Sequence, residues 1–292
     1  MVGRMRTKPA RKAELKAVTP DDLRALVAKS PKIGARLVEA AAQQGILTAQ
    51  MTYARMLLLG QDVPRNRAAA FDWFATAAES GDPEALNMIG KCFEFGWGVE
   101  ADRKRAAERY RVAARHVYVL AQYNLGQLLL SGEPNPAQRR EGLGWHLVAA
   151  KAGYAKSMNV IGRFCEEGWE MPRSLGNALG WYRKAAEGGD HWGQFNLGRL
   201  LAEDGDLEEA AHWFRIAAES GNEEFANSIA PVLIKRPERE FQAIGHMIAD
   251  RRKTKTAQTA VAATDKAVRR QPRHRQPGNG WFARRATGLP AT

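Results

Sequence analysis

A block of small residues recurs through most of this 292-residue chain at a nearly constant interval. The block consists of two adjacent alanines, and in five of six copies a glycine follows three residues after the second alanine. The six copies begin at Ala41, Ala77, Ala113, Ala149, Ala185 and Ala217. The first four steps are 36 residues and the last is 32 residues. Because a period of about 20 to 50 residues is typical of stacked supersecondary units, the chain is predicted to be a solenoid.

The apolar residues within each period have the spacing of α-helices. Ile89, Cys92 and Phe93 follow one another at i, i+3 and i+4, which places them on one helical face. Asp82 and Pro83 supply an N-cap acceptor and a proline at the first helical position. Each period is therefore predicted to be a helix-turn-helix unit, and no segment predicts a sheet.

Two further columns of residues share the repeat phase. The first, in the first helix of each unit, is small: Ala54, Gly90, Gly126, Gly162, Gly198 and Ala230. The second, in the second helix, contains Trp73, Trp145, Trp181 and Trp213, and beside it lie Phe74, Tyr110, Tyr182 and Phe214. The small column predicts close contact between helices, and the aromatic column predicts buried packing between repeats. An alternative for the aromatic column is a stacking platform for bases or sugars.

Each unit follows the pattern A-x-x-x-x-L-G-x-x-x-x-x-G, a short connector and then W-Y-x-x-A-A-x-x-G. The pattern resembles the Sel1-like repeat family, a relative of the tetratricopeptide repeats, over residues 33–232. Arg109 and Val117 depart from it, since they replace the tryptophan and the closing glycine of their unit. The resemblance implies an all-α solenoid of about six 36-residue helix-turn-helix repeats with terminal capping helices. It implies a role in assembly, signalling or secretion-related complexes and names no partner.

The positive charge of the chain is concentrated at its two ends. The formal net charge is +12, but residues 1–19 carry +5 and residues 251–292 carry +10, so the part between them is close to neutral. Three segments are predicted: a basic, disordered N-terminal arm at 1–19, the solenoid with its capping helices at 20–252, and a basic, disordered C-terminal tail at 253–292. The disorder is predicted because the tails have too little apolar surface to fold alone.

The sequence contains no residue pattern typical of several classes of function. The sequence predicts neither a signal peptide nor a membrane span, and it predicts a cytoplasmic protein. Cys92 and Cys165 lie two repeats apart and are predicted to be buried rather than paired. The six histidines form no metal-ligand motif, and no nucleophile elbow or phosphate loop occurs. The chain is therefore predicted to have no catalytic residue, no metal site and no cofactor, and not to be an enzyme.

A candidate binding surface lies on the first helices, on the side opposite the apolar stripe. Counting from the small column, positions −3 and +1 are predicted to face solvent. The +1 row contains Arg55, Lys91, Gln127, Arg163 and Arg199. The −3 row contains Met51, Asn87, Tyr123, Asn159, Phe195 and Asn227. In related families the first helices line the concave surface, so the resemblance implies a groove for a partner segment.

The alternative for these rows is an ordinary solvated helix face with pairs such as Lys91 with Glu94, Arg163 with Glu166 or Glu167, and Arg199 with Glu203. Arg55 has no acidic residue at such spacings and is predicted to be the freest contact.

The leading functional prediction is a non-catalytic scaffold or adaptor that binds a segment of a partner protein of unknown identity. The alternative is a nucleic-acid or anionic-membrane binder that works through the basic tails, which is also conceivable as an auxiliary contact of the scaffold. Eleven basic residues follow position 250, and each could neutralise a phosphate. Trp281 and Phe282 could stack on bases or insert into lipid.

Overall fold

The computed structural model describes residues 31–250, and no strand occurs in that range. Twelve helices have defined bounds: α3 (Pro31–Gln43), α4 (Leu47–Leu59), α5 (Arg67–Ala78), α6 (Pro83–Phe95), α7 (Arg103–Arg115), α8 (Val119–Leu130), α9 (Pro136–Lys151), α10 (Ala155–Glu167), α11 (Leu175–Glu187), α12 (His191–Asp204), α13 (Leu207–Ser220) and α14 (Glu223–Ile234). Residues 239–250 form a further helical segment. The all-α prediction is confirmed.

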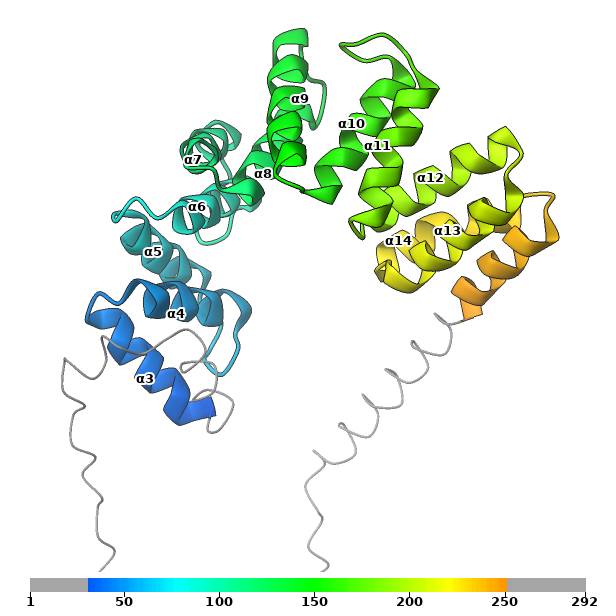
Figure 1. Cartoon of the computed structure of the whole chain (residues 1–292). Coiled ribbons are helices and arrows are strands. Elements are labelled where there is room, and N and C mark those ends of the chain that lie inside the picture. The colour runs from blue at the N-terminus through cyan, green and yellow to red at the C-terminus, as the bar shows by residue number, and fades with distance from the viewer. Residues whose placement is uncertain (1–30, 251–292) are drawn as a thin grey trace, which may run out of the picture. The chain divides into compact units, whose positions relative to one another are not determined.

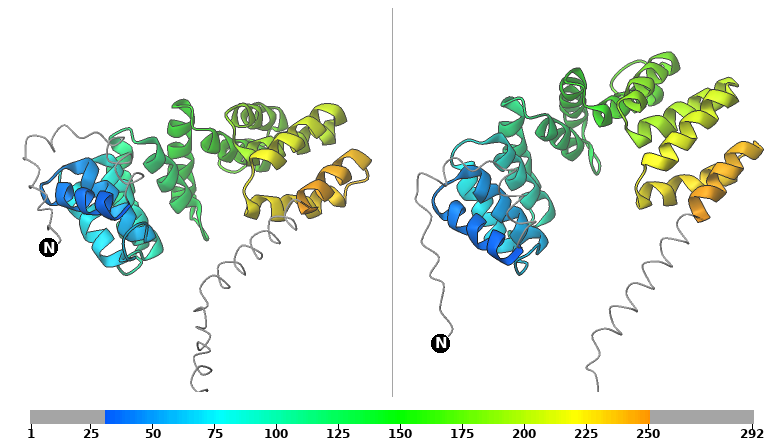
Figure 2. Two further views of the ribbon diagram at one scale, coloured as in Figure 1. Left: turned by 90° about the horizontal axis from the view of Figure 1, so that it is seen from below. Right: turned by 60° about the horizontal axis from the view of Figure 1, so that its bottom comes forward.

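From α3 to α13, each helix packs against the next one along the chain, so this part of the fold is a series of helix pairs (Figure 1). The complete pairs are α4–α5, α6–α7, α8–α9, α10–α11 and α12–α13. The six copies seen in the sequence arise because α3 supplies one more Ala-Ala block before them and α14 supplies one more small residue after them. The described helices divide into two compact units, one ending at Gly221 and one beginning at Asn222. In Figure 2 the pairs of the first unit follow in the order of the chain.

Local capping explains why the helices start where they do. All five second helices follow an Asn, Asp or Ser whose side chain accepts a hydrogen bond from the backbone three residues later. Asn135 and Gln138 complete a reciprocal capping box at the start of α9. Val117 stands where other repeats have glycine and still adopts a left-handed backbone, with φ of 60°. The repeat geometry therefore persists even where the glycine is missing.

The small column lies directly against buried rings of the second helices. A Cβ on Gly90, Gly126, Gly162 or Gly198 would approach Tyr110, His146, Tyr182 or Phe214 to 2.5–2.8 Å, which no real Cβ tolerates. The predicted close helix contact is thus confirmed at these four glycines, where a Cβ would clash with the facing ring.

The aromatic column needs a correction. The fully buried rings are Phe74, Tyr110, His146, Tyr182 and Phe214, each at most 3% exposed. The tryptophans one residue earlier are only partly buried, because one residue turns a helix by about 100° and carries the side chain away from the partner helix. The second residue of each adjacent pair is therefore the buried one, and part of each tryptophan lies at the surface.

The unit beginning at Asn222 contains α14 and the segment 239–250. Arg236, in the turn between them, lies over the ring of Phe241 at 5.8 Å and pairs with Glu238 at 2.8 Å. Phe241, Ile244 and Ile248 are buried, so this helical segment has an apolar face. None of the described helices is long and apolar enough to cross a membrane. The predicted arm 1–19, tail 253–292 and N-terminal capping helix lie outside the described residues.

Candidate functional site

Two members of the +1 row form ion pairs between neighbouring first helices. Arg55 of α4 pairs with Glu84 at the start of α6, so the prediction that Arg55 is the freest contact is wrong. Arg199 of α12 reaches Glu166 of α10 at 2.5 Å and Glu203 of its own helix at 3.0 Å. Both arginines therefore join repeats, through Glu84 and Glu166, which a search within one helix does not find.

The other three members of the +1 row form no ion pair within residues 31–250. Lys91 is partly exposed, while Gln127 and Arg163 are exposed. The Gln127 amide donates to the Tyr123 hydroxyl at 3.0 Å, and the Arg163 guanidinium lies 5.7 Å from the centre of the Trp169 ring. These three residues occupy the same position in the consecutive first helices α6, α8 and α10.

The glutamates expected to pair with Lys91 and Arg163 accept hydrogen bonds from tyrosines instead. The Tyr110 hydroxyl donates to Glu94 at 2.6 Å, and the Tyr182 hydroxyl donates to Glu166 at 2.7 Å. Burial, together with these carboxylates, raises the pKa of both tyrosines well above the ordinary value. Of the intrahelical ion pairs considered for this face, Arg199 with Glu203 is found in the described part of the chain.

The −3 row mostly faces neighbouring helices rather than solvent, contrary to the prediction. Asn87 is 2% exposed and accepts from the Asn124 amide at 2.8 Å. Asn159 accepts from the Asn196 amide at 2.9 Å. Each pair joins two successive first helices, α6 with α8 and α10 with α12. The predicted exposure is wrong because the periodicity of one helix does not show which of its faces a neighbouring helix covers.

The remaining members of the −3 row are largely aromatic or apolar and pack inward. Phe195 and Met51 are buried, and Tyr123 is partly buried with its ring 5.1 Å from Tyr154 and 5.6 Å from His146. Asn227 of α14 is exposed.

Many of these contacts recur every second repeat. Glu94 and Tyr110 have counterparts 72 residues later in Glu166 and Tyr182. Three glutamines at the same spacing each donate a hydrogen bond to a carbonyl of the preceding Ala-Ala block: Gln50 at 3.4 Å, Gln122 at 3.2 Å and Gln194 at 3.3 Å. The structural unit is thus a pair of repeats. The sequence already indicates this longer unit, because these residues are identical at a spacing of 72 residues and differ at a spacing of 36 residues.

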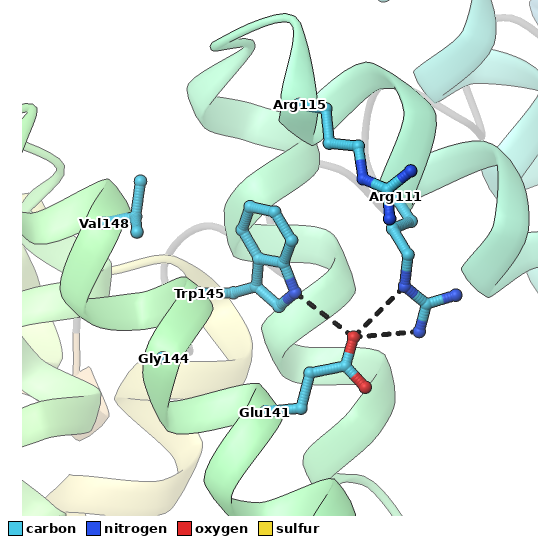
Figure 3. A pocket seen from close by; sticks show the side chains of 6 residues that line it. All are labelled: Arg111, Arg115, Glu141, Gly144, Trp145 and Val148. Carbon is cyan, nitrogen blue, oxygen red and sulfur yellow. Dashed lines mark hydrogen bonds and ion pairs between the residues drawn. The ribbon is translucent and has the colours of Figure 1, made fainter.

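A pocket of about 430 Å³ lies between α7 and α9. It is lined by Arg111, Arg115, Glu141, Gly144, Trp145 and Val148 (Figure 3). One oxygen of Glu141 accepts from Arg111 Nε at 3.1 Å and Nη2 at 2.9 Å, and from the Trp145 indole N–H at 3.4 Å. Sequence reasoning missed this site because its residues come from two repeats and from the helices expected only to pack.

The described side chains offer ionic, amide and stacking contacts rather than an evident reaction centre. Within residues 31–250, no group of three or more His, Cys, Asp or Glu could hold a metal ion. Cys92 and Cys165 are buried, and burial raises the pKa of the Cys92 thiol to about 12. His146 is fully buried with Nδ1 3.1 Å from Ser157 Oγ, and burial lowers its pKa to about 4.

The chain is similar to several known repeat proteins. A solved Sel1 repeat protein from Oxalobacter formigenes is 21% identical with a TM-score of 0.64, and the match covers 80% of this chain and 99% of that one. A protective antigen of uropathogenic Escherichia coli is 23% identical with a TM-score of 0.62, and the match covers 84% of this chain but 55% of that one. An immunity protein from Pseudomonas aeruginosa is 16% identical with a TM-score of 0.50, over 70% of this chain and 80% of that one. At these identities the likeness shows the fold alone.

The model of the Sel1 repeat matches five segments, residues 48–82, 83–116, 119–154, 155–190 and 193–222. Together these segments make up more than half of the chain, and they correspond to the complete helix pairs from α4 to α13. The chain belongs to the Sel1 repeat family.

Proposed function

We propose that the protein is a non-catalytic interaction scaffold that binds a segment of a partner protein along Lys91, Gln127 and Arg163. The observation that carries this proposal is their shared position in three consecutive first helices, with no ion pair within residues 31–250. An extended chain advances about 3.3 Å per residue. A short extended segment that crosses α6, α8 and α10 would therefore meet the three side chains of the row in succession.

Neighbouring rings support the row. Tyr123 holds the Gln127 amide by a hydrogen bond, and Trp169 lies against the Arg163 guanidinium. Such contacts reduce the number of rotamers that binding has to freeze. Two cations and one amide are complementary to a partner segment with acidic and polar side chains.

The other residues predicted for the site have a supporting part in this proposal. Five of them hold successive first helices in register through ion pairs, amide pairs and packed rings: Arg55, Asn87, Tyr123, Asn159 and Arg199. The ring of Phe195 packs against Phe214 of α13 instead. Reversing Arg55 or Arg199 would break contacts between repeats, so these residues are unsuitable for testing binding.

The test is the double variant Lys91→Glu with Arg163→Glu. The full-length protein and the variant are used to capture partners from cell lysate at moderate salt, and retained proteins are quantified by mass spectrometry. We expect partners retained by the original protein to be lost from the variant, because like charges across an interface oppose binding. Lys151→Glu with Lys235→Glu is the control, since both residues are exposed and the change in net charge is the same. Equal loss from both pairs, or none from the first, would exclude this row.

Binding of nucleic acid or anionic membrane through the basic tails remains the alternative function. Its residues lie outside the described part of the chain, and its support is the net charge of +10 carried by residues 251–292.

A further inference from the structure

The contact that shapes the pocket occurs twice in the molecule. Between α7 and α9, Glu141 joins Arg111 to the Trp145 indole. Between α11 and α13, Glu209 joins Arg183, at 2.6 Å, to the Trp213 indole, at 3.2 Å. The two sites stand in corresponding positions, two repeats apart. One chain therefore contains two versions of the same arrangement, and their differences can be compared directly.

The second version carries a histidine ring where the first has a glycine. His212 of α13 corresponds to Gly144 of α9, and its ring lies 5.4 Å from that of Trp213. A Cβ built on Gly144 would meet no atom within 4 Å. The charge at the rim also differs, because Glu187 of α11 corresponds to Arg115 of α7. The pocket between α7 and α9 is thus both hollow and cationic.

Trp145 also differs from the other tryptophans of its column. The Lys184 ammonium lies 4.8 Å from the centre of the Trp181 ring, and the Tyr53 ring meets the Trp73 ring edge-on at 5.7 Å. Within residues 31–250, Trp145 has neither a ring nor a cation against its face; its indole N–H is held by Glu141. Figure 3 shows this ring between Arg115 and Val148. It presents a fixed apolar face to the pocket.

The charges around the pocket leave one cation uncompensated. Glu141 pairs with Arg111 at 2.9 Å, whereas Arg115 is exposed and forms no ion pair within the described residues. Helix α7 as a whole carries six Lys or Arg residues and one Glu. Val148, opposite, is 44% exposed and apolar. A ligand that matches these features has a carboxylate next to an apolar group.

We propose that this pocket binds a side-chain carboxylate from an acidic segment of a partner protein, with the flanking apolar side chain against Trp145 and Val148. The carboxylate pairs with Arg115, since a charge-assisted hydrogen bond to guanidinium is the strongest contact available there. The apolar neighbour covers the indole face. Aromatic residues buried in this way contribute a large share of the binding energy of interfaces. This site lies on second helices and does not depend on the Lys91, Gln127 and Arg163 row.

The experiment uses full-length protein labelled with ¹⁵N at the indole of its eight tryptophans. Trp145→Phe identifies the Trp145 resonance by its disappearance. The probe is the blocked tripeptide acetyl-Leu-Glu-Leu-amide, and acetyl-Leu-Gln-Leu-amide is its uncharged counterpart. We expect a saturable shift of the Trp145 resonance with the Glu peptide and not with the Gln peptide. Arg115→Glu should weaken binding by about tenfold or more, because it places like charge against the carboxylate.

Matched glycine substitutions test the shape of the pocket. Gly144→His copies the second version and should abolish the shift. Gly180→His is the control, because Gly180 takes the same place in the next repeat and also has open space around it. It should leave the Trp145 response unchanged. The reverse change, His212→Gly with Glu187→Arg, should give the Trp213 resonance a new response to the Glu peptide.

Four results would overturn the proposal. They are an equal response to the Gln peptide, a response only to a peptide with a free C-terminal carboxylate, equal loss in Gly144→His and Gly180→His, and no gain at Trp213. The variant Lys91→Glu with Arg163→Glu should keep the Trp145 response. Failure of the first-helix row and failure of this pocket are therefore distinguishable.

Discussion

His146 is a buried polar residue at a position where other repeats place Phe or Tyr. Its Nδ1 meets Ser157 Oγ, its Nε2 has no hydrogen-bond partner in the described structure, and its pKa is lowered by burial. Ser157 in turn stands where neighbouring repeats have Ala85, Ala121 and Gly193. The histidine and the serine thus replace an aromatic and a small residue together. The sequence showed the substitution, but the ring's hydrogen bond required the structure.

Acid should destabilise the protein through His146. The folded pKa of about 4 lies below the ordinary value of 6.5, so the unfolded chain binds the proton more readily. The stability is fully present above about pH 6.5 and is lost as the pH falls through about 4. Between pH 7 and pH 4.5 this group alone should lower the free energy of unfolding by roughly 2 to 3 kcal/mol.

The measurement is urea unfolding at both pH values. His146→Phe with Ser157→Ala, which copies the other repeats, should show a smaller loss between pH 7 and pH 4.5 by about the same 2 to 3 kcal/mol. Equal losses in the two proteins would mean that His146 does not titrate in this range.

At the scale of the element, the close approach of first and second helices depends on the missing Cβ of the small column. A Cβ on Gly162 would lie 2.6 Å from the Tyr182 ring. Gly180 lies in a helix as well, but a Cβ there meets nothing within 4 Å. Substitutions at these two glycines therefore distinguish the effect of packing on stability from the effect of helix propensity.

We expect Gly162→Ala to destabilise the protein by about 1 to 3 kcal/mol, the usual cost of overpacking. Gly180→Ala should stabilise it by about 0.5 to 1 kcal/mol, because alanine favours the helix. Thermal unfolding followed by circular dichroism checks both. A Gly162→Ala protein as stable as Gly180→Ala would show that the helices can separate without loss.

The elements themselves were predictable, and their side-chain partners were not. Helical spacing and caps indicated the helix pairs, since both are properties of neighbouring residues. Arg55 pairs with a residue about 30 positions away, and Asn87 with one 37 positions away. Contacts between repeats depend on the rotation of one helix against another, which the pattern of one helix does not contain. The predicted solvent exposure of the two rows was therefore only partly correct, and their role in binding stays a prediction.

At the scale of the whole molecule, the repeat period determines the architecture and the ends of the chain carry the charge. The period predicted a solenoid correctly, whereas the division at Gly221 and the pocket between α7 and α9 had no counterpart in the sequence pattern. The pocket depends on how particular side chains of two repeats come together, which the pattern of one repeat does not contain.

Deleting residues 253–292 tests the alternative function. The deletion removes nine Lys or Arg residues and one Asp, a net charge of +8. Binding to RNA or to vesicles with anionic lipid should weaken steeply, and its dependence on salt should flatten. The melting temperature should stay the same, because this composition cannot form a core. Fluorescence anisotropy and vesicle sedimentation measure the first effect, and undiminished binding would exclude the tail as the contact.

The two-repeat period also bears on how such a chain can change in length. Asn87 with Asn124 and Asn159 with Asn196 join the first helix of one repeat to that of the next, whereas the junction from α8 to α10 uses Tyr123 and Tyr154. From α6 to α12, these amide and aromatic junctions therefore alternate. Duplication of a 72-residue cassette would keep them matched, while gain or loss of a single repeat would set an amide against an aromatic ring. Two repeats are thus the step in length that preserves these contacts.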